Sequence, residues 1–252
     1  MQKIIALLLF SAIVQAQDLS LVGISPSYSL TGKLAPKIAY NINLMSVINA
    51  TNQTVEGKFF PSGQAHFLQT GMLIYQLNKQ FSVGGGYTHG NHNIFGLKES
   101  EHRFLAQTTY QTKFKKLVFS NRLRYELRYP FNEKTGIRSK ADIVRYQFWL
   151  TYPLYDPRAG NQGFFLSASN EAFLYLKGAI NGPVSSRNGG LWSENWSHLG
   201  GGYNAGRTRI ELGYCFQTLV RNQAKDHRFF NLLQVNLYST LNWDDVQFWW
   251  YQ

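Results

Sequence analysis

The strongest constraint on this chain is a strict two-residue alternation of side-chain character over long segments. From Leu117 to Tyr129, the odd-numbered positions are apolar or aromatic except for Asn121. The even-numbered positions include four charged residues, Arg122, Arg124, Glu126 and Arg128. A β-strand sends successive side chains to opposite faces, whereas a helix would mix the two sets. The segment therefore predicts a strand with one apolar face and one charged face.

The same alternation recurs along the chain and predicts ten strands. They are expected at residues 35–49, 64–77, 80–90, 101–113, 116–130, 139–152, 163–176, 194–204, 207–219 and 226–241. The preceding segment 17–34 either adds an eleventh strand or packs at a rim. Most of these strands are longer than ten residues, whereas strands of soluble proteins are typically about 5–6 residues long.

The predicted connections alternate between short and long. Short turns are expected at 78–79, 115 and 204–206, and longer polar or glycine-rich loops at 50–63, 91–100, 131–138, 177–193 and 220–225. The joint at 153–162 is longer than the other short connections. Short turns at one end and long loops at the other are typical of outer-membrane barrels. With ten strands, both chain ends are expected at the short-turn end.

The N-terminus has the pattern of an export signal. A positive start at Lys3 precedes an apolar run from Ile4 to Val14, and Ala16 offers a cleavage site. That run is shorter than the roughly 20 residues of a transmembrane helix. We therefore expect a cleaved signal peptide at 1–16, an N-terminal segment at 17–34, a barrel at 35–241 and a C-terminal tail at 242–252.

Composition narrows the class of protein further. Charged residues are 15% of the chain, below the roughly 25% of soluble domains, and aromatic residues are also 15%. The net charge of +11 is dispersed along the strands, which argues against a nucleic-acid partner. The single cysteine, Cys215, excludes an internal disulfide and a cysteine-based metal cluster.

These features predict an all-β fold, a transmembrane antiparallel up-and-down β-barrel of about ten strands, within a range of ten to twelve. The expected location is the outer membrane of a Gram-negative bacterium. The expected partners are outer-membrane lipids and the barrel-assembly machinery, and no cofactor is expected. Alternation by itself also fits a soluble periplasmic β-protein, which is the alternative fold class.

Several segments in a fixed order carry a family resemblance. They are Glu101–Phe104, Asn121–Arg128, Phe165–Glu171, Glu211–Tyr214 and His227–Phe229 leading into Leu237–Tyr238. Together they resemble the uncharacterised domain-of-unknown-function family 2490 over about 35–241. The resemblance implies an exported outer-membrane barrel and no particular activity. Such chains tend to end near the last strand, whereas this one continues to Gln252.

The polar faces of the predicted strands hold the main candidate site. Its members are Arg103, Arg122, Arg124, Glu126, Arg128, Arg145, Glu171, Arg209, Glu211 and Arg228. If they face the barrel interior, they either fill it as a ladder of Arg–carboxylate pairs or form an anion-attracting constriction. The first role fits a structural barrel and the second a narrow, porin-like pore, and neither is an enzyme.

A lipid-modifying enzyme is the alternative function. His198 would act as the base for Ser167 or Ser169 across neighbouring strands, with Glu171 orienting the imidazole. Asn170 is a further candidate near this set. Adjacent Ser197 and His198 point to opposite faces of a strand, so they are not expected to act on each other.

Three other patterns have a structural explanation. His89 and His92 lie three residues apart and are expected in a solvated loop, since no third metal ligand is evident. The glycine triplets 84–86 and 200–202 do not match a nucleotide-binding loop and indicate close backbone approach. The repeated His-Arg-Phe at 102–104 and 227–229 predicts inward arginines and outward phenylalanines. The repeat forms either a structural feature of the barrel rim or paired sites for an anionic headgroup or solute.

Overall fold

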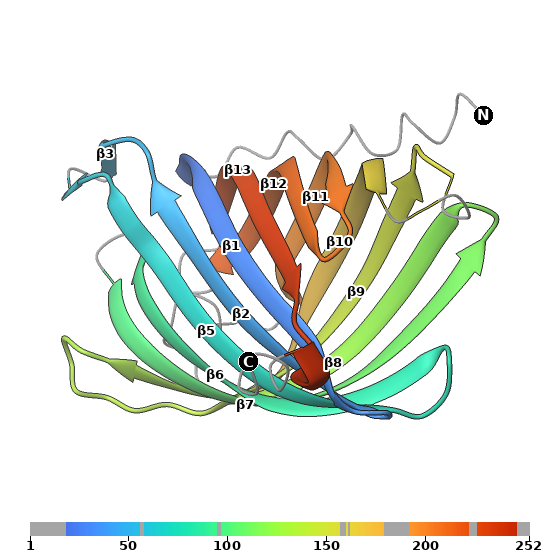
Figure 1. Ribbon diagram of the computed structural model, residues 1–252. Coiled ribbons are helices and arrows are strands. Elements are labelled where there is room, and N and C mark those ends of the chain that lie inside the picture. Colours follow the sequence, from blue (N-terminus) through green and yellow to red (C-terminus); the bar gives the residue numbers. More distant parts are fainter. Residues whose placement is uncertain are drawn as a thin grey trace.

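The computed structural model describes residues 19–55, 58–94, 97–156, 160, 162–178, 192–221 and 226–245. Eleven strands form one closed barrel (Figure 1), in the order β1-β13-β12-β11-β10-β9-β8-β7-β6-β5-β2. They are β1 (Leu19–Ala35), β2 (Ile38–Asn49), β5 (Gly63–Gln76), β6 (Phe81–Ile94), β7 (Leu97–Phe114), β8 (Leu117–Asn132), β9 (Ala141–Pro153), β10 (Gln162–Gly178), β11 (Trp192–Ala205), β12 (Thr208–Arg221) and β13 (Asp226–Thr240). The ten predicted strands are all present, and their bounds agree to within four residues.

The barrel closes through a parallel pair, which corrects the fully antiparallel prediction. Strands β1 and β13 run side by side in the same direction, from Leu19 opposite Arg228 to Thr31 opposite Thr240 (Figure 1). All other neighbouring strands of the barrel are antiparallel. An alternating meander with an odd number of strands must bring its first and last strands together in parallel. The segment left open by the sequence is thus the eleventh strand, and the barrel begins at Leu19 rather than at residue 35.

The two ends of the barrel differ in their connections. Among the described residues, the turn end holds the connections 36–37, 77–80, 115–116 and 206–207, and the loop end holds residues 50–55, 58–62 and 133–140. Most of the predicted loops at 177–193 and 220–225 lie outside the described residues. Strand β1 starts at the loop end and β13 finishes at the turn end. The first strand therefore begins and the last strand finishes at opposite ends of the barrel, whereas an even number of strands would place both at the turn end.

One predicted loop is largely strand. Residues 91–100 were expected to form a loop, but β6 runs to Ile94 and β7 begins at Leu97. The segment is rich in polar residues, which suggested a solvated loop, but the inward face of this barrel is itself polar. His92 and Glu99, from this segment, are both buried in the interior.

The two faces of the barrel wall have opposite character to those of a soluble barrel. Large apolar side chains are exposed on the outside, among them Ile42, Leu73, Phe104, Leu123, Leu166, Leu199, Ile210, Leu212, Tyr214 and Leu233. Charged side chains are buried on the inside, among them Arg103, Glu126, Arg128, Arg145, Glu171 and Glu211. In the first His-Arg-Phe segment, Arg103 is buried in the interior, away from the rim at which it was expected, while the neighbouring Phe104 is 55% exposed outside.

Glycine triplets lie where strands approach closely. A methyl group on Gly86 of β6 would meet the Gly71 carbonyl oxygen at 2.3 Å, and one on Gly202 of β11 would meet the Ile210 carbonyl oxygen at 2.0 Å. A methyl group on the intervening Gly85 would come no closer than 3.7 Å to the Leu105 carbonyl oxygen. The inward-facing glycines are therefore required by the neighbouring backbone.

A short hairpin and a helical turn lie outside the barrel sheet. Strands β3 (Gln53–Val55) and β4 (Lys58–Phe60) pair as a separate hairpin at the loop end. After β13, Trp243–Asp245 form one helical turn. Among the residues that the structure describes, no helix has the length and apolar character needed to cross a membrane. The predicted signal peptide at 1–16 lies outside the described residues.

Candidate functional site

A network of buried charges occupies the interior on the β7–β10 side of the barrel. It consists of five arginines and three glutamates, Arg103, Arg122, Arg124, Arg128, Arg145, Glu101, Glu126 and Glu171. Below, these eight residues are called the charged network. Period-two alternation places them there, because every member lies on the inward face of its strand.

Glu126 and Glu171 each link arginines of two neighbouring strands, β8 and β9. Glu126 Oε2 accepts from Arg128 Nε and Nη2 at 2.8 and 2.6 Å, and its Oε1 accepts from Arg145 Nη1 at 2.6 Å. Arg145 also donates to both oxygens of Glu171, at 2.9 and 2.8 Å. Charge-assisted bonds of this kind offset the high desolvation cost of burying the ions.

The network is not electrically balanced. Five guanidinium groups face three carboxylates, which leaves an excess of two positive charges among these residues. The excess lies toward the turn end, at Arg122 and Arg124. Arg122 shares Glu171 with Arg145, while Arg124 donates to the neutral Gln107 Oε1 at 3.0 and 2.7 Å and lies 3.6 Å from Glu126.

A second cluster centres on Glu211 of β12. Glu211 Oε1 accepts from the Ser167 hydroxyl at 2.6 Å and is 2.8 Å from His198 Nε2, and its Oε2 accepts from Arg209 Nη2 at 2.6 Å. The Arg209 guanidinium stacks over the Phe165 ring at 3.8 Å. The carboxylate is fully buried, so these three partners are what keep it in the interior.

The catalytic arrangement considered for a lipid enzyme is not assembled. His198 Nε2 is directed to Glu211, not to Glu171, which is occupied by Arg122 and Arg145. Ser167 donates to the same Glu211 oxygen and so does not donate to His198. Ser169 lies opposite His198 in the strand register, but His198 Nε2 bonds Glu211 and its Nδ1 has no hydrogen-bond partner, so Ser169 and His198 are not bonded. Asn170 bonds Asn195 and Ser197 instead. Ser167 and His198 therefore act as ligands of one buried carboxylate.

The interior contains a third polar cluster that the sequence did not suggest. His92 is 2.9 Å from His66 through their Nδ1 atoms and 3.0 Å from Glu101 through Nε2, and Glu101 accepts from Arg103 at 2.7 Å. His92 was expected in a loop with His89, but both lie on β6 and, three residues apart, face opposite sides of it. The sequence held one sign of this cluster, because Glu99, Glu101 and Arg103 occupy alternate positions and therefore share one face of a strand.

A complete ring of buried side chains closes the interior in its loop-end half. Each strand contributes at least one inward-facing residue that is no more than 7% exposed, namely Leu21, Val47, His66, Ile94, Glu101, Arg128, Ile143, Phe173, Glu194, Leu219 and Leu232. On the β12, β13, β1, β2, β5 and β6 side this ring is an apolar cluster that includes Leu21, Val47 and Leu232. On the other side it combines Glu101 and Arg128 of the charged network with the buried Ile143, Phe173 and Glu194.

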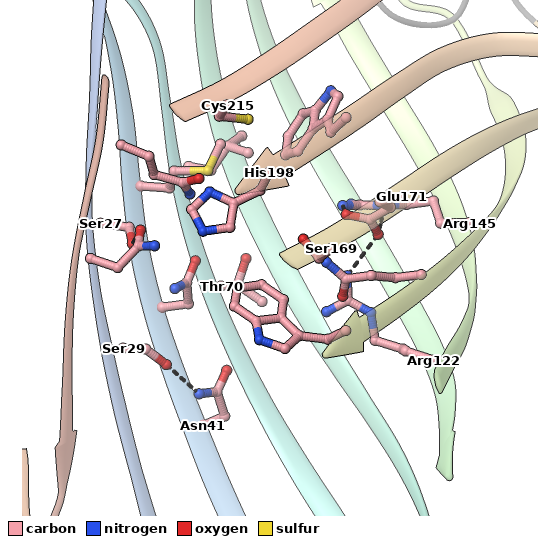
Figure 2. A pocket seen from close by; sticks show the side chains of 18 of the residues that line it. Ser27, Ser29, Asn41, Thr70, Arg122, Arg145, Ser169, Glu171, His198 and Cys215 are labelled. Carbon is pink, nitrogen blue, oxygen red and sulfur yellow. Dashed lines mark hydrogen bonds and ion pairs between the residues drawn. The ribbon is translucent and has the colours of Figure 1, made fainter. Parts of the chain in front are cut away.

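In the turn-end half the interior is open. A cavity of about 400 Å³ lies against the charged network, and we call it the vestibule. Its charged lining is Arg103, Arg122, Arg124, Arg145, Arg209 and Glu171, and the His198 imidazole also lines it. Figure 2 shows Arg122, Arg145 and Glu171 on one side of this cavity and Ser27, Ser29 and Asn41 on the other. The remaining predicted member, Arg228, lies near the loop end on the inward register of β13 and is half-buried.

No site of metal-ligand character stands out. Within the described ranges, no three His, Cys, Asp or Glu side chains group closely enough to hold a metal ion. Cys215 lines the vestibule and is buried.

Comparison with known proteins confirms the family resemblance and adds no activity. No curated protein matches the chain. A family profile, by contrast, matches residues 26–228, from within β1 to the start of β13. The chain therefore belongs to the family described as Protein of unknown function (DUF2490).

Proposed function

We propose that this protein is an outer-membrane barrel that crosses the lipid bilayer but does not conduct ions through its interior. The observation that carries the proposal is the reversed polarity of the wall, with apolar side chains such as Leu123, Leu199 and Leu212 outside and a buried charged network inside. Water would penalise that outer surface, whereas a bilayer would bury it. Strands of 12–18 residues exceed the roughly 9–11 residues that a tilted strand needs to span a bilayer.

The closed interior supports a role without conduction. A through-pore needs a continuous path of water, and the ring at the loop-end half leaves its members almost inaccessible to water. The ring also joins eleven strands through ion pairs and apolar contacts, so it serves as the core of the barrel. Most of the arginines therefore fill the barrel interior, and they face solvent only where they line the vestibule.

Membrane insertion is tested by folding the protein into lipid vesicles. The vesicles are washed with alkaline carbonate and with high salt, and then floated on a density gradient. We expect the protein to stay with the vesicles and to need detergent for release. Release by salt alone would show a soluble periplasmic protein and would contradict the proposal.

Closure is tested in the same preparation by planar-bilayer recording. The expected result is silence from barrels whose insertion is shown by resistance to protease. Steady conductance by the wild-type protein would refute the closed interior and restore the narrow pore. Measured ion selectivity, with and without Arg122→Gln, would then identify the conducting path.

A further inference from the structure

We infer that the vestibule is a binding site for a small polyhydroxylated anion of monosaccharide size, a sugar phosphate or a sugar acid, entering from the turn end. The inference rests on the proposed function, because it takes the turn end as the open mouth of a closed barrel. It is carried by the chemistry of two opposing walls. Each wall holds polar atoms that are buried and unsatisfied within the protein.

The first wall attracts the anionic group. Five arginines line the vestibule against one glutamate, Glu171. The Nε atoms of Arg122 and Arg209 are buried and have no hydrogen-bond partner, although both side chains keep a fraction of their surface open, 23% and 27%. Guanidinium groups bind carboxylate and phosphate oxygens in a planar, bidentate geometry. This wall therefore matches an oxyanion.

The opposite wall is uncharged and suits hydroxyl groups. It is built from hydroxyl and amide side chains of β1, β2, β5, β6 and β13, including Ser27, Ser29, Asn41, Thr70, Thr88 and Asn236. Asn41 Nδ2 donates to Ser29 Oγ at 2.9 Å and Ser27 donates to Asn236 Oδ1 at 2.6 Å, which fixes their orientation. Asn236 is 1% exposed and its Nδ2 lacks a partner. Amides and hydroxyls both donate and accept, as a polyol requires.

Aromatic rings complete the cavity between the two walls. Trp149 and Trp196 both line it, and Trp149 is held by stacking on His198 at a ring distance of 5.7 Å. Its indole N–H donates to the Thr151 hydroxyl at 3.2 Å, so the ring is fixed in place. Apolar and aromatic surface with a few oriented polar groups is typical of small-molecule sites, whose volumes run from about 300 to 1,000 Å³.

Entry is from the turn end, along a basic path. A second cavity of about 520 Å³ shares Arg122, Trp149 and Arg209 with the vestibule and continues to Lys113. A third, of about 670 Å³, adds Lys115 and Lys116 at the rim, together with one acid, Asp156. This gradient of positive charge would raise the local concentration of anions and guide them inward. The closed ring blocks the other direction.

Binding is tested by titration calorimetry on the full chain folded in detergent. The ligands are glucose 6-phosphate and glucuronate, with glucose and inorganic phosphate as partial ligands. We expect at least one of the two hydroxylated anions to bind at least about ten-fold more tightly than either partial ligand, because it alone contacts both walls. If neither hydroxylated anion binds, or if inorganic phosphate binds as tightly, the inference is wrong.

Arg122→Gln is the informative variant, because Glu171 keeps two hydrogen bonds from Arg145 and the network remains closed. It should weaken binding by about 10- to 100-fold, the usual effect of losing a charge-assisted bond. Arg138→Gln is the matched control, since Arg138 is exposed and stacks on Phe131. Equal loss in both variants would contradict the site.

Asn41→Ala provides a second test that does not depend on the charged network. It should weaken binding of the hydroxylated anion while leaving any weak binding of inorganic phosphate unchanged. The two proposals fail separately. A barrel that floats with vesicles but binds none of these ligands removes only the ligand inference, and binding by a protein that salt releases from vesicles removes only the membrane role.

Discussion

Arg124 of β8 and Arg145 of β9 lie directly opposite each other across a strand pair, both buried in the barrel interior. Two like charges in this position repel. Glu126 relieves the repulsion, because its Oε1 lies 2.6 Å from Arg145 Nη1 and 3.6 Å from Arg124 Nη1. Glu126 is therefore the carboxylate that both of these facing arginines share, while Glu171 contacts Arg145 from the other side.

We expect Glu126→Gln to lower the free energy of unfolding by about 3–5 kcal/mol, because removing one partner of a buried ion pair leaves the other charges uncompensated. Glu99→Gln is the matched control. Glu99 is equally buried, but its Oε1 has no hydrogen-bond partner, so neutralising it should cost little or nothing. Urea unfolding of both variants in micelles measures the difference. Similar losses would show that the charged network has no special role.

The closed ring and the open vestibule predict a contrast in chemical accessibility. In a Cys215→Ser background, Thr109→Cys in the turn-end cavity should react rapidly with a charged methanethiosulfonate reagent. Leu219→Cys, at a position that is 3% exposed in the apolar cluster, should react only after unfolding. Mass spectrometry of the folded protein gives both rates. Rapid modification at position 219 would indicate an open interior.

The inward glycines predict a sharp difference between neighbouring positions. Gly86→Ala places a methyl group 2.3 Å from the Gly71 carbonyl oxygen and should force the β5–β6 pair apart, at a cost of about 1–3 kcal/mol. Gly85→Ala, with 3.7 Å to the nearest atom, should be tolerated. Comparing the urea midpoints of these two variants separates local crowding from a general intolerance of alanine. Equal midpoints would argue against crowding.

The short helical turn after β13 predicts that the contacts between the end of β13 and β1 weaken in acid. Asp245 accepts from the Asn242 backbone N–H and from Arg207, both at 2.9 Å, and these contacts hold the pKa of its carboxyl below the ordinary value. Leu241 donates to the Thr31 carbonyl of β1, and Tyr40 donates to the Leu241 carbonyl. A depressed pKa stabilises the folded state above the unfolded pKa, and this contribution is lost as the pH falls through the folded pKa.

Asp245→Asn should therefore speed amide exchange at Leu241 at pH 7, and the difference from the wild-type protein should narrow as the pH falls below about 4. Hydrogen exchange read by mass spectrometry at both pH values measures this. Asp244→Asn changes the same charge one residue away and serves as the control. A difference that persists unchanged in acid would exclude the carboxylate as the cause.

The sequence by itself determined the strands and their two faces. Alternation is a local property of extended backbone, so the segment around Arg122–Arg128 assigned its own charged and apolar sides without knowledge of any partner. The same phase would have placed Glu99 and His92 on strands, had the polar composition of 91–100 not suggested a loop. The family resemblance followed from the same segments.

The tertiary structure decided closure and partners. Strand β1 (Leu19–Ala35) forms because β13 and β2 pair with its two edges, and the odd number of strands makes the closing pair parallel. Glu211 rather than Glu171 contacts His198, and Arg145 joins Glu126 to Glu171. These pairings depend on strand register and barrel stagger, which arise from the packing of all eleven strands together. For the same reason, the one-ended vestibule is a property of the closed barrel that no local pattern contains.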